Sequence, residues 1–255
     1  MAITETVHSE EEFIFDKSIT CPACGEPFKT KILKSSKARR IGSDLDLRPR
    51  YAHIDTLKYG VCSCPNCGYS ALHSVFPHVV GRQIENIKQE VCVRFMSEDR
   101  SRWKSYSYDQ AIRLHELALK CAEAKPAKDG EKAYLHLLIA WLIREKGAQT
   151  EEIADAALQT ASREACEKEA DEHYLQALEG FERAMMNEMF PIMGMNQPTL
   201  EYVMAYMAYY FGRIEVAAKL LGSVLTNKST SRHVKDNALD LKDEIIGQLR
   251  QKKQE

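Results

Sequence analysis

The sequence lacks the local motifs that would assign it to a common enzyme class. Its 255 residues contain no Gly-rich phosphate-binding loop, no His-Glu-x-x-His pair and no Gly-x-Ser-x-Gly turn. Nor do its acidic, basic and nucleophilic residues gather into a recognisable catalytic set. We therefore expect a protein without enzymatic activity, unless the metal site discussed below carries chemistry of its own.

Strong net charge and long hydrophobic runs are missing too. The 35 basic and 37 acidic residues give a formal charge of −2, which favours neither general nucleic-acid binding nor an acidic tail. The longest apolar stretch, Ala133–Ile143, is shorter than the ~20 residues that a membrane helix needs. The first twelve residues are polar and acidic, unlike a signal peptide. We expect a cytoplasmic protein that contacts no membrane.

Cysteine is the residue that is present in an informative pattern. The segments Cys21-Pro22-Ala23-Cys24-Gly25 and Cys64-Pro65-Asn66-Cys67-Gly68 repeat one short motif. Two residues between cysteines let both thiolates face one ion, and two such turns supply four tetrahedral ligands. A glycine after each second cysteine permits a positive φ. The sequence predicts that Cys21, Cys24, Cys64 and Cys67 bind one structural Zn²⁺.

Other uses of these thiols remain open. A pair of disulfides or a redox Cys-x-x-Cys is disfavoured because the Cys-Pro-x-Cys-Gly motif is duplicated, whereas iron bound as in rubredoxin is a closer competitor because it takes the same four thiolates. Strand alternation places Cys62 on the side of Cys64, either as a substitute ligand or, as we prefer, packed beside the site. The isolated Cys92, Cys121 and Cys166 fit small buried apolar residues.

The chain changes character near residue 80, where short β-branched and aromatic segments give way to long stretches with helical periodicity. We expect a polar tail over 1–12, a zinc-ribbon-like domain over 13–80 and a helical domain over 81–255. The residues Ser35–Arg50 read as a polar loop. Strands are expected over Phe13–Thr20, Pro27–Leu33, Lys58–Ser63 and Tyr69–Phe76.

Helical periodicity and chain breakers define the elements of the second part. Pro126, Gly130, Gly147, Pro191 and Gly194 mark helix ends. The expected helices run over approximately Ile84–Phe95, Tyr106–Ala124, Glu131–Lys146, Glu151–Asn187, Pro198–Phe211, Ile214–Thr226 and Ser231–Lys252.

Small and aromatic residues recur at the same spacing on several of these helices. The repeated positions are Tyr108, Ala111 and Ala118; Tyr174, Ala177, Phe181 and Ala184; and Ile214, Ala217, Leu221 and Val224. This resembles a tetratricopeptide repeat, although its usual tryptophan position holds His136 or Glu201; a generic antiparallel bundle is the alternative. The predicted fold class is α+β, mostly α, with a small N-terminal zinc ribbon of short antiparallel strands before tetratricopeptide-like antiparallel helices.

The segment 26–52 has a local basic excess, eight basic residues against three acidic ones. With Phe28 and Tyr51 nearby, it can in principle contact phosphates and stack a base. The basic residues that would carry this role are Lys29, Lys31, Lys34, Lys37, Arg39 and Arg40. A solvated loop is the interpretation we favour, because aromatic residues are few and no docking helix follows.

The order of motifs resembles a bacterial family known as domain of unknown function 2225. We call the two Cys-Pro-x-Cys-Gly motifs knuckles. The segments that match the family are these knuckles together with Ser43-Asp44-Leu45, Tyr59–Gly68 and Ala140-Trp141-Leu142-Ile143-Arg144. The resemblance covers nearly the whole chain and implies a bacterial cytoplasmic protein without an assigned activity.

Repeat surfaces and a closed metal site together favour a non-enzymatic adaptor that binds a protein or peptide through its helices. Tyr202, Tyr206, Tyr209 and Tyr210 crowd one helix, where most should serve core packing and some can line a groove. The alternatives are nucleic-acid binding through the basic segment and an iron redox protein.

Overall fold

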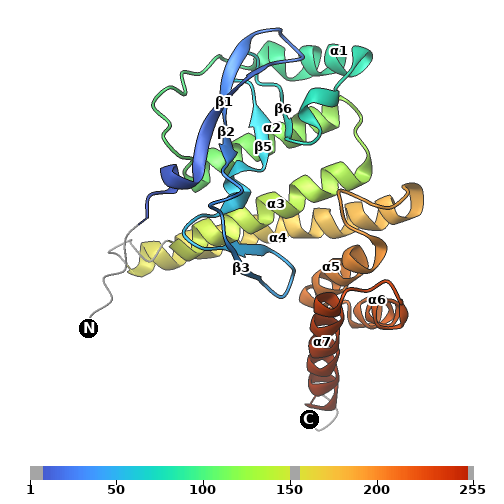
Figure 1. Cartoon of the computed structure of the whole chain (residues 1–255). Helices are drawn as coiled ribbons and strands as arrows, with labels where there is room; N and C mark the ends of the chain where they lie inside the picture. The colour runs from blue at the N-terminus through green and yellow to red at the C-terminus, as the bar shows by residue number, and fades with distance from the viewer. Residues whose placement is uncertain (1–7, 150–155, 252–255) are drawn as a thin grey trace. The chain divides into compact units, whose positions relative to one another are not determined.

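The computed structural model describes residues 8–149 and 156–251 (Figure 1). They form two compact units that interleave along the chain. The first contains the described residues up to Gly42, together with Arg50–Ala127 and Leu135–His173. The second contains Ser43–Pro49, Lys128–Tyr134 and the described residues from Tyr174 onward. The expected boundary at residue 80 therefore falls inside the first unit.

Two short antiparallel hairpins form the strand portion of the first unit. Strand β1 (Ile14–Thr20) pairs with β2 (Pro27–Leu33), and β5 (Val61–Ser63) pairs with β6 (Ser70–Leu72). Each hairpin encloses one cysteine knuckle. The predicted third strand begins later than expected because Thr56–Tyr59 forms the 3₁₀ helix η2, and the fourth is shorter, with Phe76–His78 forming η3.

The predicted N-terminal tail lies partly outside the described residues. Within its last part, Ser9 caps the short 3₁₀ helix η1 (Glu10–Phe13). The Glu10 carboxylate then binds Lys58 Nζ at 2.5 Å and accepts a hydrogen bond from Tyr59 Oη at 2.9 Å. Since Lys58 is buried, this ion pair ties the start of the described chain to the first unit.

The prediction of an irregular loop over Ser35–Arg50 was wrong. Strands β3 (Arg40–Ser43) and β4 (Pro49–Tyr51) pair there, and the N–H of Asp44 donates to the carbonyl of Arg48 at 2.9 Å. These strands are only three or four residues long and half-exposed or exposed, so they leave no hydrophobic alternation for sequence analysis to detect.

The turn between β3 and β4 belongs to the second unit and is packed inside it. Asp46 and Arg48 are both buried, in contrast to the solvated loop that we expected. Tyr174 Oη donates to Asp46 Oδ2 at 3.2 Å, and Tyr202 Oη donates to the carbonyl of Leu45 at 2.6 Å. Two tyrosines on later helices thus hold this turn in place.

Helices complete the first unit. Helix α1 (Gly81–Glu90) is followed by the 3₁₀ helix η4 (Cys92–Arg94). The α-helix therefore ends before Phe95, where the apolar pattern predicted its end. Helix α2 (Tyr108–Ala124) starts at a Ser107–Gln110 capping box. It packs against β5, β6 and α1, as the green helix behind the strands in Figure 1 shows. Its apolar face therefore covers a sheet.

Helices α3 (Asp129–Ala148) and α4 (Ala156–Asn187) are each divided between the two units. The predicted start of α4 at Glu151 lies outside the described residues. In the second unit Gly180 of α4 approaches α3 closely, since a Cβ there would lie 2.8 Å from the Cβ of Ala133. A small residue is required at this helix crossing, at a position that the predicted repeat register did not include.

The second unit continues with α5 (Gln197–Tyr210), α6 (Ile214–Thr226) and α7 (Arg232–Gln251); residue 252 of the last predicted helix is outside the described part. The tight corner between α5 and α6 depends on Gly212 at φ +70°. The register residues Ala177, Phe181, Ala184, Ala217, Leu221 and Val224 are all buried.

The predicted fold class, α+β and mostly α with short antiparallel strands at the N-terminus, is confirmed. A tetratricopeptide stack stays a prediction. Its first expected helix, α2, packs against strands, whereas the later register positions lie in the other unit. Among the described helices, none is long and apolar enough to cross a membrane.

Candidate metal centre

The two cysteine knuckles have the same backbone conformation. In the first, the N–H of Gly25 donates to the carbonyl of Cys21 at 2.8 Å; in the second, the N–H of Gly68 donates to Cys64 at 3.0 Å. Gly25 has φ +82° and Gly68 has φ +79°, the left-handed conformation predicted for both. The local sequence alone therefore folds each pair of thiols toward one side.

The hairpins bring the four predicted ligands together. The Sγ atoms of Cys21, Cys24, Cys64 and Cys67 all lie within 4.8 Å of one another. Cys21 Sγ and Cys67 Sγ are 3.7 Å apart, and Cys24 Sγ and Cys64 Sγ are 3.8 Å apart. In a tetrahedral site with Zn–S bonds of ~2.3 Å, the sulfurs lie about 3.8 Å apart. The cluster can thus hold one metal ion.

The four thiols lie close enough to hydrogen-bond with one another. Hydrogen bonds from Cys21 and Cys67 lower the pKa of Cys64, and backbone N–H groups of Cys67 and Asn66 act in the same direction. Donating those bonds raises the pKa of Cys21 and of Cys67. One thiolate is therefore stabilised by its neighbours' protons, which a bound cation would replace.

The centre lies in the core of the first unit. Cys21 and Cys64 have no solvent exposure, while Cys24 and Cys67 are half-buried. Tyr69, Phe28, Phe76 and Ile87 belong to the same apolar cluster. The ion would consequently join both hairpins to the helices that cover them.

Cys62 lies next to the centre and is not a member of the four-thiol group. It is 1% exposed, and burial raises the pKa of its thiol to about 12. A protonated thiol packed in an apolar core matches the role that we preferred for Cys62. The group that can hold a metal ion therefore contains four cysteines and not five.

Three residues that lie beside the centre, Asn66, Cys92 and Cys121, were not predicted from the sequence to do so. Asn66 Nδ2 donates to Cys24 Sγ at 3.6 Å across the two knuckles. Cys121 of α2 accepts a hydrogen bond from the N–H of Ser70 at 3.4 Å, and a hydrogen bond with Cys67 lowers the pKa of Cys92. The two cysteines were expected to be isolated, and no spacing links them to the knuckles, because they come from later helices. Only Asn66, inside a knuckle, had a local signal.

The nearby histidines stand apart from the four-thiol group. His53 stacks on Phe13 with ring centroids 6.1 Å apart. His115 of α2 is fully buried, binds the carbonyl of Ala111 through Nδ1 at 2.7 Å, and has its pKa lowered to about 4 by burial. It is thus a neutral residue of the core.

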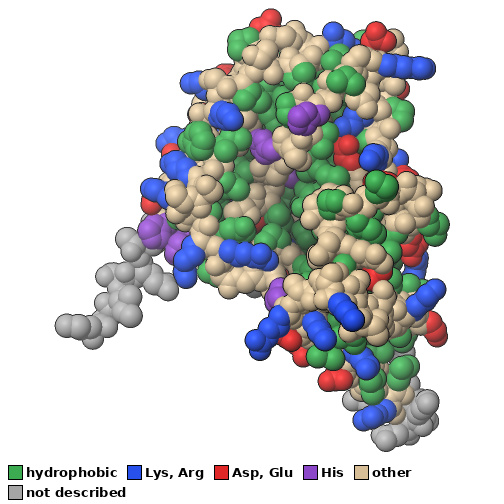
Figure 2. Space-filling model, turned by 45° about the vertical axis from the view of Figure 1, so that its right-hand side comes forward, with side chains coloured by type: hydrophobic (Ala, Val, Ile, Leu, Met, Phe, Trp, Pro, Cys, Tyr) green, Lys and Arg blue, Asp and Glu red, His purple; other side chains and the backbone are tan. Residues whose placement is uncertain are grey.

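Three of the six basic residues expected to contact nucleic acid have partners within the protein. Lys31 pairs with Asp16 at 2.9 Å, Lys34 donates to the carbonyl of Glu12 at 3.1 Å, and Arg40 donates to that of Gly42. Lys29, Lys37 and Arg39 are exposed, but Phe28 is buried in the core. On the face drawn in Figure 2, Lys and Arg side chains lie among apolar and acidic ones, without a continuous basic stripe over the described residues.

A protein-family model matches most of the chain. The model of a family described as an uncharacterized protein conserved in bacteria, DUF2225, covers residues 14–245. The chain belongs to this family. Neither the curated proteins nor the solved structures contain a match. Membership in DUF2225 confirms the resemblance noted from the knuckles and the later Ala140–Arg144 segment, and it covers both units.

Proposed function

We propose that this DUF2225 protein is a non-enzymatic adaptor in which a structural Zn²⁺ stabilises the first unit and the helices of the second unit bind a protein partner. The observation that carries the first half is the four-thiol cluster, with its sulfur distances of 3.7 and 3.8 Å. Four thiolates fill a tetrahedral shell, which is typical of structural zinc and leaves no position for a reacting water.

The position of the cluster supports a structural role. Cys21 and Cys64 are fully buried, and the cluster is continuous with the apolar core. Because the hairpins are short, with little core of their own, metal binding would supply much of their folding free energy. We propose cytoplasmic Zn²⁺ as the ion, with iron bound as in rubredoxin as the alternative.

Metal analysis of freshly purified full-length protein tests this part. We expect about one equivalent of zinc per chain and no absorption in the visible range. Stoichiometric iron with a visible thiolate-to-iron absorption would refute the zinc assignment. Loss of one equivalent in Cys64→Ala, with retention in Cys62→Ala, would show that the proposed ligands hold the ion.

Exposed apolar side chains support the second half of the proposal. In the second unit Met186 is 82% exposed, Met189 is 90% exposed and Val216 is 39% exposed. Tyr210 of α5 is 40% exposed, whereas Tyr202 is buried. Exposed methionine and tyrosine side chains are suited to a protein interface, because they adapt their shape and offer apolar area.

The partner-binding surface is best tested in the full chain. We would compare the proteins that crosslink to wild type with those that crosslink to the double variant Met189→Gln and Tyr210→Gln. The control variant is Leu158→Gln, which changes an exposed apolar residue of the first unit. A partner enriched by wild type and the control and lost from the double variant is the expected result. No specific crosslink, or the same crosslinks in all three, would refute the surface.

Nucleic-acid binding is a second candidate, favoured by one observation. Lys29 and Lys31 line a cavity of about 390 Å³ that Trp103 and Tyr106 also line. Asp16, Glu98 and Asp99 line it too, so its charge is mixed and we rank this function second. A labelled single-stranded oligonucleotide should bind with salt-dependent affinity that falls in Lys29→Glu. Binding unchanged by salt and by this variant would exclude the site.

A further inference from the structure

A second cavity lies in the first unit, between the end of α1 and the C-terminal half of α2. Its volume is about 560 Å³, which is in the range of ligand-binding pockets. One wall comes from Glu90, Val91, Arg94 and Phe95 around η4, and the other comes from α2. On α2 the lining residues are Leu117, Lys120 and Glu123, which recur at steps of three and share one helix face.

One end of this cavity is apolar and rigidly supported. Val91 is 9% exposed and belongs to the core around the metal centre, and Leu117 packs against the same core. The Phe95 ring lies directly against Gly68, since a Cβ on that glycine would be 2.4 Å from Phe95 Cγ. Phe95 is therefore in contact with the second cysteine knuckle on one side and lines the cavity on the other.

The charged side chains of the cavity are available to a ligand. Glu90, Arg94, Lys120 and Glu123 are all exposed. Within residues 8–149 and 156–251, none of the four makes a side-chain hydrogen bond or an ion pair. Two cations and two carboxylates thus border one cavity without neutralising one another by contact.

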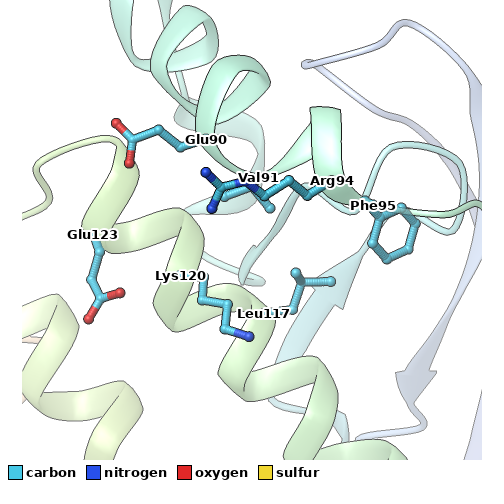
Figure 3. A pocket seen from close by; sticks show the side chains of 7 residues that line it. All are labelled: Glu90, Val91, Arg94, Phe95, Leu117, Lys120 and Glu123. Carbon is cyan, nitrogen blue, oxygen red and sulfur yellow. The ribbon is translucent and has the colours of Figure 1, made fainter.

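Figure 3 shows that these groups are ordered along the cavity. The carboxylates of Glu90 and Glu123 lie at the end away from Phe95, and the cationic groups of Arg94 and Lys120 lie between them and the apolar residues. A complementary ligand has the reverse order: a cation, then an anion, then an apolar group. The anion and the apolar group must be adjacent.

We propose that this cavity binds the carboxyl terminus of a peptide whose last residue is large and apolar and which carries a lysine or arginine shortly before it. The terminal carboxylate would pair with Arg94 and Lys120, and the last side chain would pack on Val91, Phe95 and Leu117. The basic residue upstream would face Glu90 and Glu123. Within a peptide, only the C-terminal residue carries a free carboxylate and an apolar side chain on the same carbon.

Size separates this ligand from two others with similar charges. A zwitterionic phospholipid has the same order of groups, but three apolar side chains line too little surface for two acyl chains. A free apolar amino acid would leave much of the 560 Å³ unfilled. The residues of the peptide site also differ from the exposed residues Met186, Met189, Tyr210 and Val216 of the proposed adaptor surface, so either proposal can fail without the other.

The test uses the full-length, metal-loaded chain and needs no variant at first. Two pools of N-terminally fluorescein-labelled hexapeptides end in leucine or phenylalanine, have lysine at the third position from the end, and are otherwise randomised. One pool carries a free carboxylate and the other an amide. We expect fluorescence anisotropy to show binding of the acid pool, with the amide pool weaker by about ten- to a hundredfold.

Variants then locate the site. Arg94→Gln with Lys120→Gln should weaken the acid pool to the level of the amide pool, while Arg82→Gln on the exposed face of α1 should change nothing. Glu90→Gln with Glu123→Gln should remove the preference for lysine over glutamine in the probe. Circular dichroism and metal content confirm that each variant folds.

Three results would overturn the proposal. They are equal affinities of the acid and amide pools, no binding of the acid pool at concentrations up to about 1 mM, and a loss of affinity in the Arg82→Gln control as large as in the cavity variants. Binding of phosphatidylethanolamine vesicles in place of the peptides would assign the cavity to a lipid headgroup and also refute the peptide.

Discussion

Gly25 and Gly68 permit a matched test of what holds the metal centre in place. Both follow the second cysteine of a knuckle with nearly equal φ values, +82° and +79°. A Cβ on Gly25 would meet nothing within 4 Å, whereas one on Gly68 would lie 2.4 Å from Phe95 Cγ. Replacement by alanine therefore adds the same backbone strain at both sites and a steric clash at only one.

The two costs can be estimated separately. An L-residue in the left-handed conformation costs roughly 1–2 kcal/mol, which is the loss of stability expected for Gly25→Ala. Forcing an extra methyl group into a packed site costs about 1–3 kcal/mol more. We therefore expect Gly68→Ala to lose roughly 2–5 kcal/mol, because the added methyl group would lie within 3 Å of Phe95 Cβ as well as its ring.

Urea denaturation of zinc-loaded protein measures both changes, with the metal content checked before each titration. The double variant Gly68→Ala and Phe95→Ala completes a double-mutant cycle with the single Phe95→Ala. In it the clash is absent, so the cost of Gly68→Ala should return to that of Gly25→Ala. Equal losses for both single variants, or no recovery in the double variant, would show that Phe95 does not press on the second knuckle.

Three other measurements follow from the described contacts. Cys64→Ala and chelation of the wild type should both remove the metal and destabilise the first unit, whereas Cys62→Ala should keep one equivalent of metal. Atomic absorption measures the metal content, and circular dichroism measures the folding. Burial lowers the pKa of His115 to about 4, so its neutral form stabilises the fold above pH 6.5 and this contribution falls as pH drops toward 4. His115→Gln should thus lose about 2–3 kcal/mol less than wild type between pH 7 and 4.5 in urea denaturation; parallel losses would contradict the assignment. In the second unit, Gly222→Ala meets no atom within 4 Å and should stabilise by roughly 0.5–1 kcal/mol, whereas Gly180→Ala should destabilise; thermal unfolding that ranks them the other way would contradict the close helix crossing.

The features predicted correctly from the sequence are local ones. A Cys-Pro-x-Cys-Gly turn has its conformation set by five neighbouring residues, so the positive φ of Gly25 and Gly68 could be read in advance. The joining of the two turns was predictable because two half-sites complete one tetrahedral shell. Helices α2, α5 and α6 were found within a few residues, since their apolar period and their breaker residues lie in the segment itself.

Long-range packing decided the rest. The β3–β4 hairpin carries no hydrophobic alternation, and its turn is buried only because Tyr174 and Tyr202, more than 120 residues later, donate hydrogen bonds to it. Cys92 in η4 and Cys121 in α2 come close to the metal centre because these elements pack against it. Their spacing from the knuckles in the sequence therefore could not predict this proximity.

The amino-acid sequence by itself determined which four cysteines form a group able to hold a metal ion, the fold class and most helices, because each depends on short-range spacing. The tertiary structure alone decided that α2 covers the strands, that the chain divides into interleaved units, and that Phe95 seals the second knuckle while forming one end of a charged cavity. Those outcomes depend on how the surfaces of distant segments pack against one another, and the sequence of a single segment does not determine this packing.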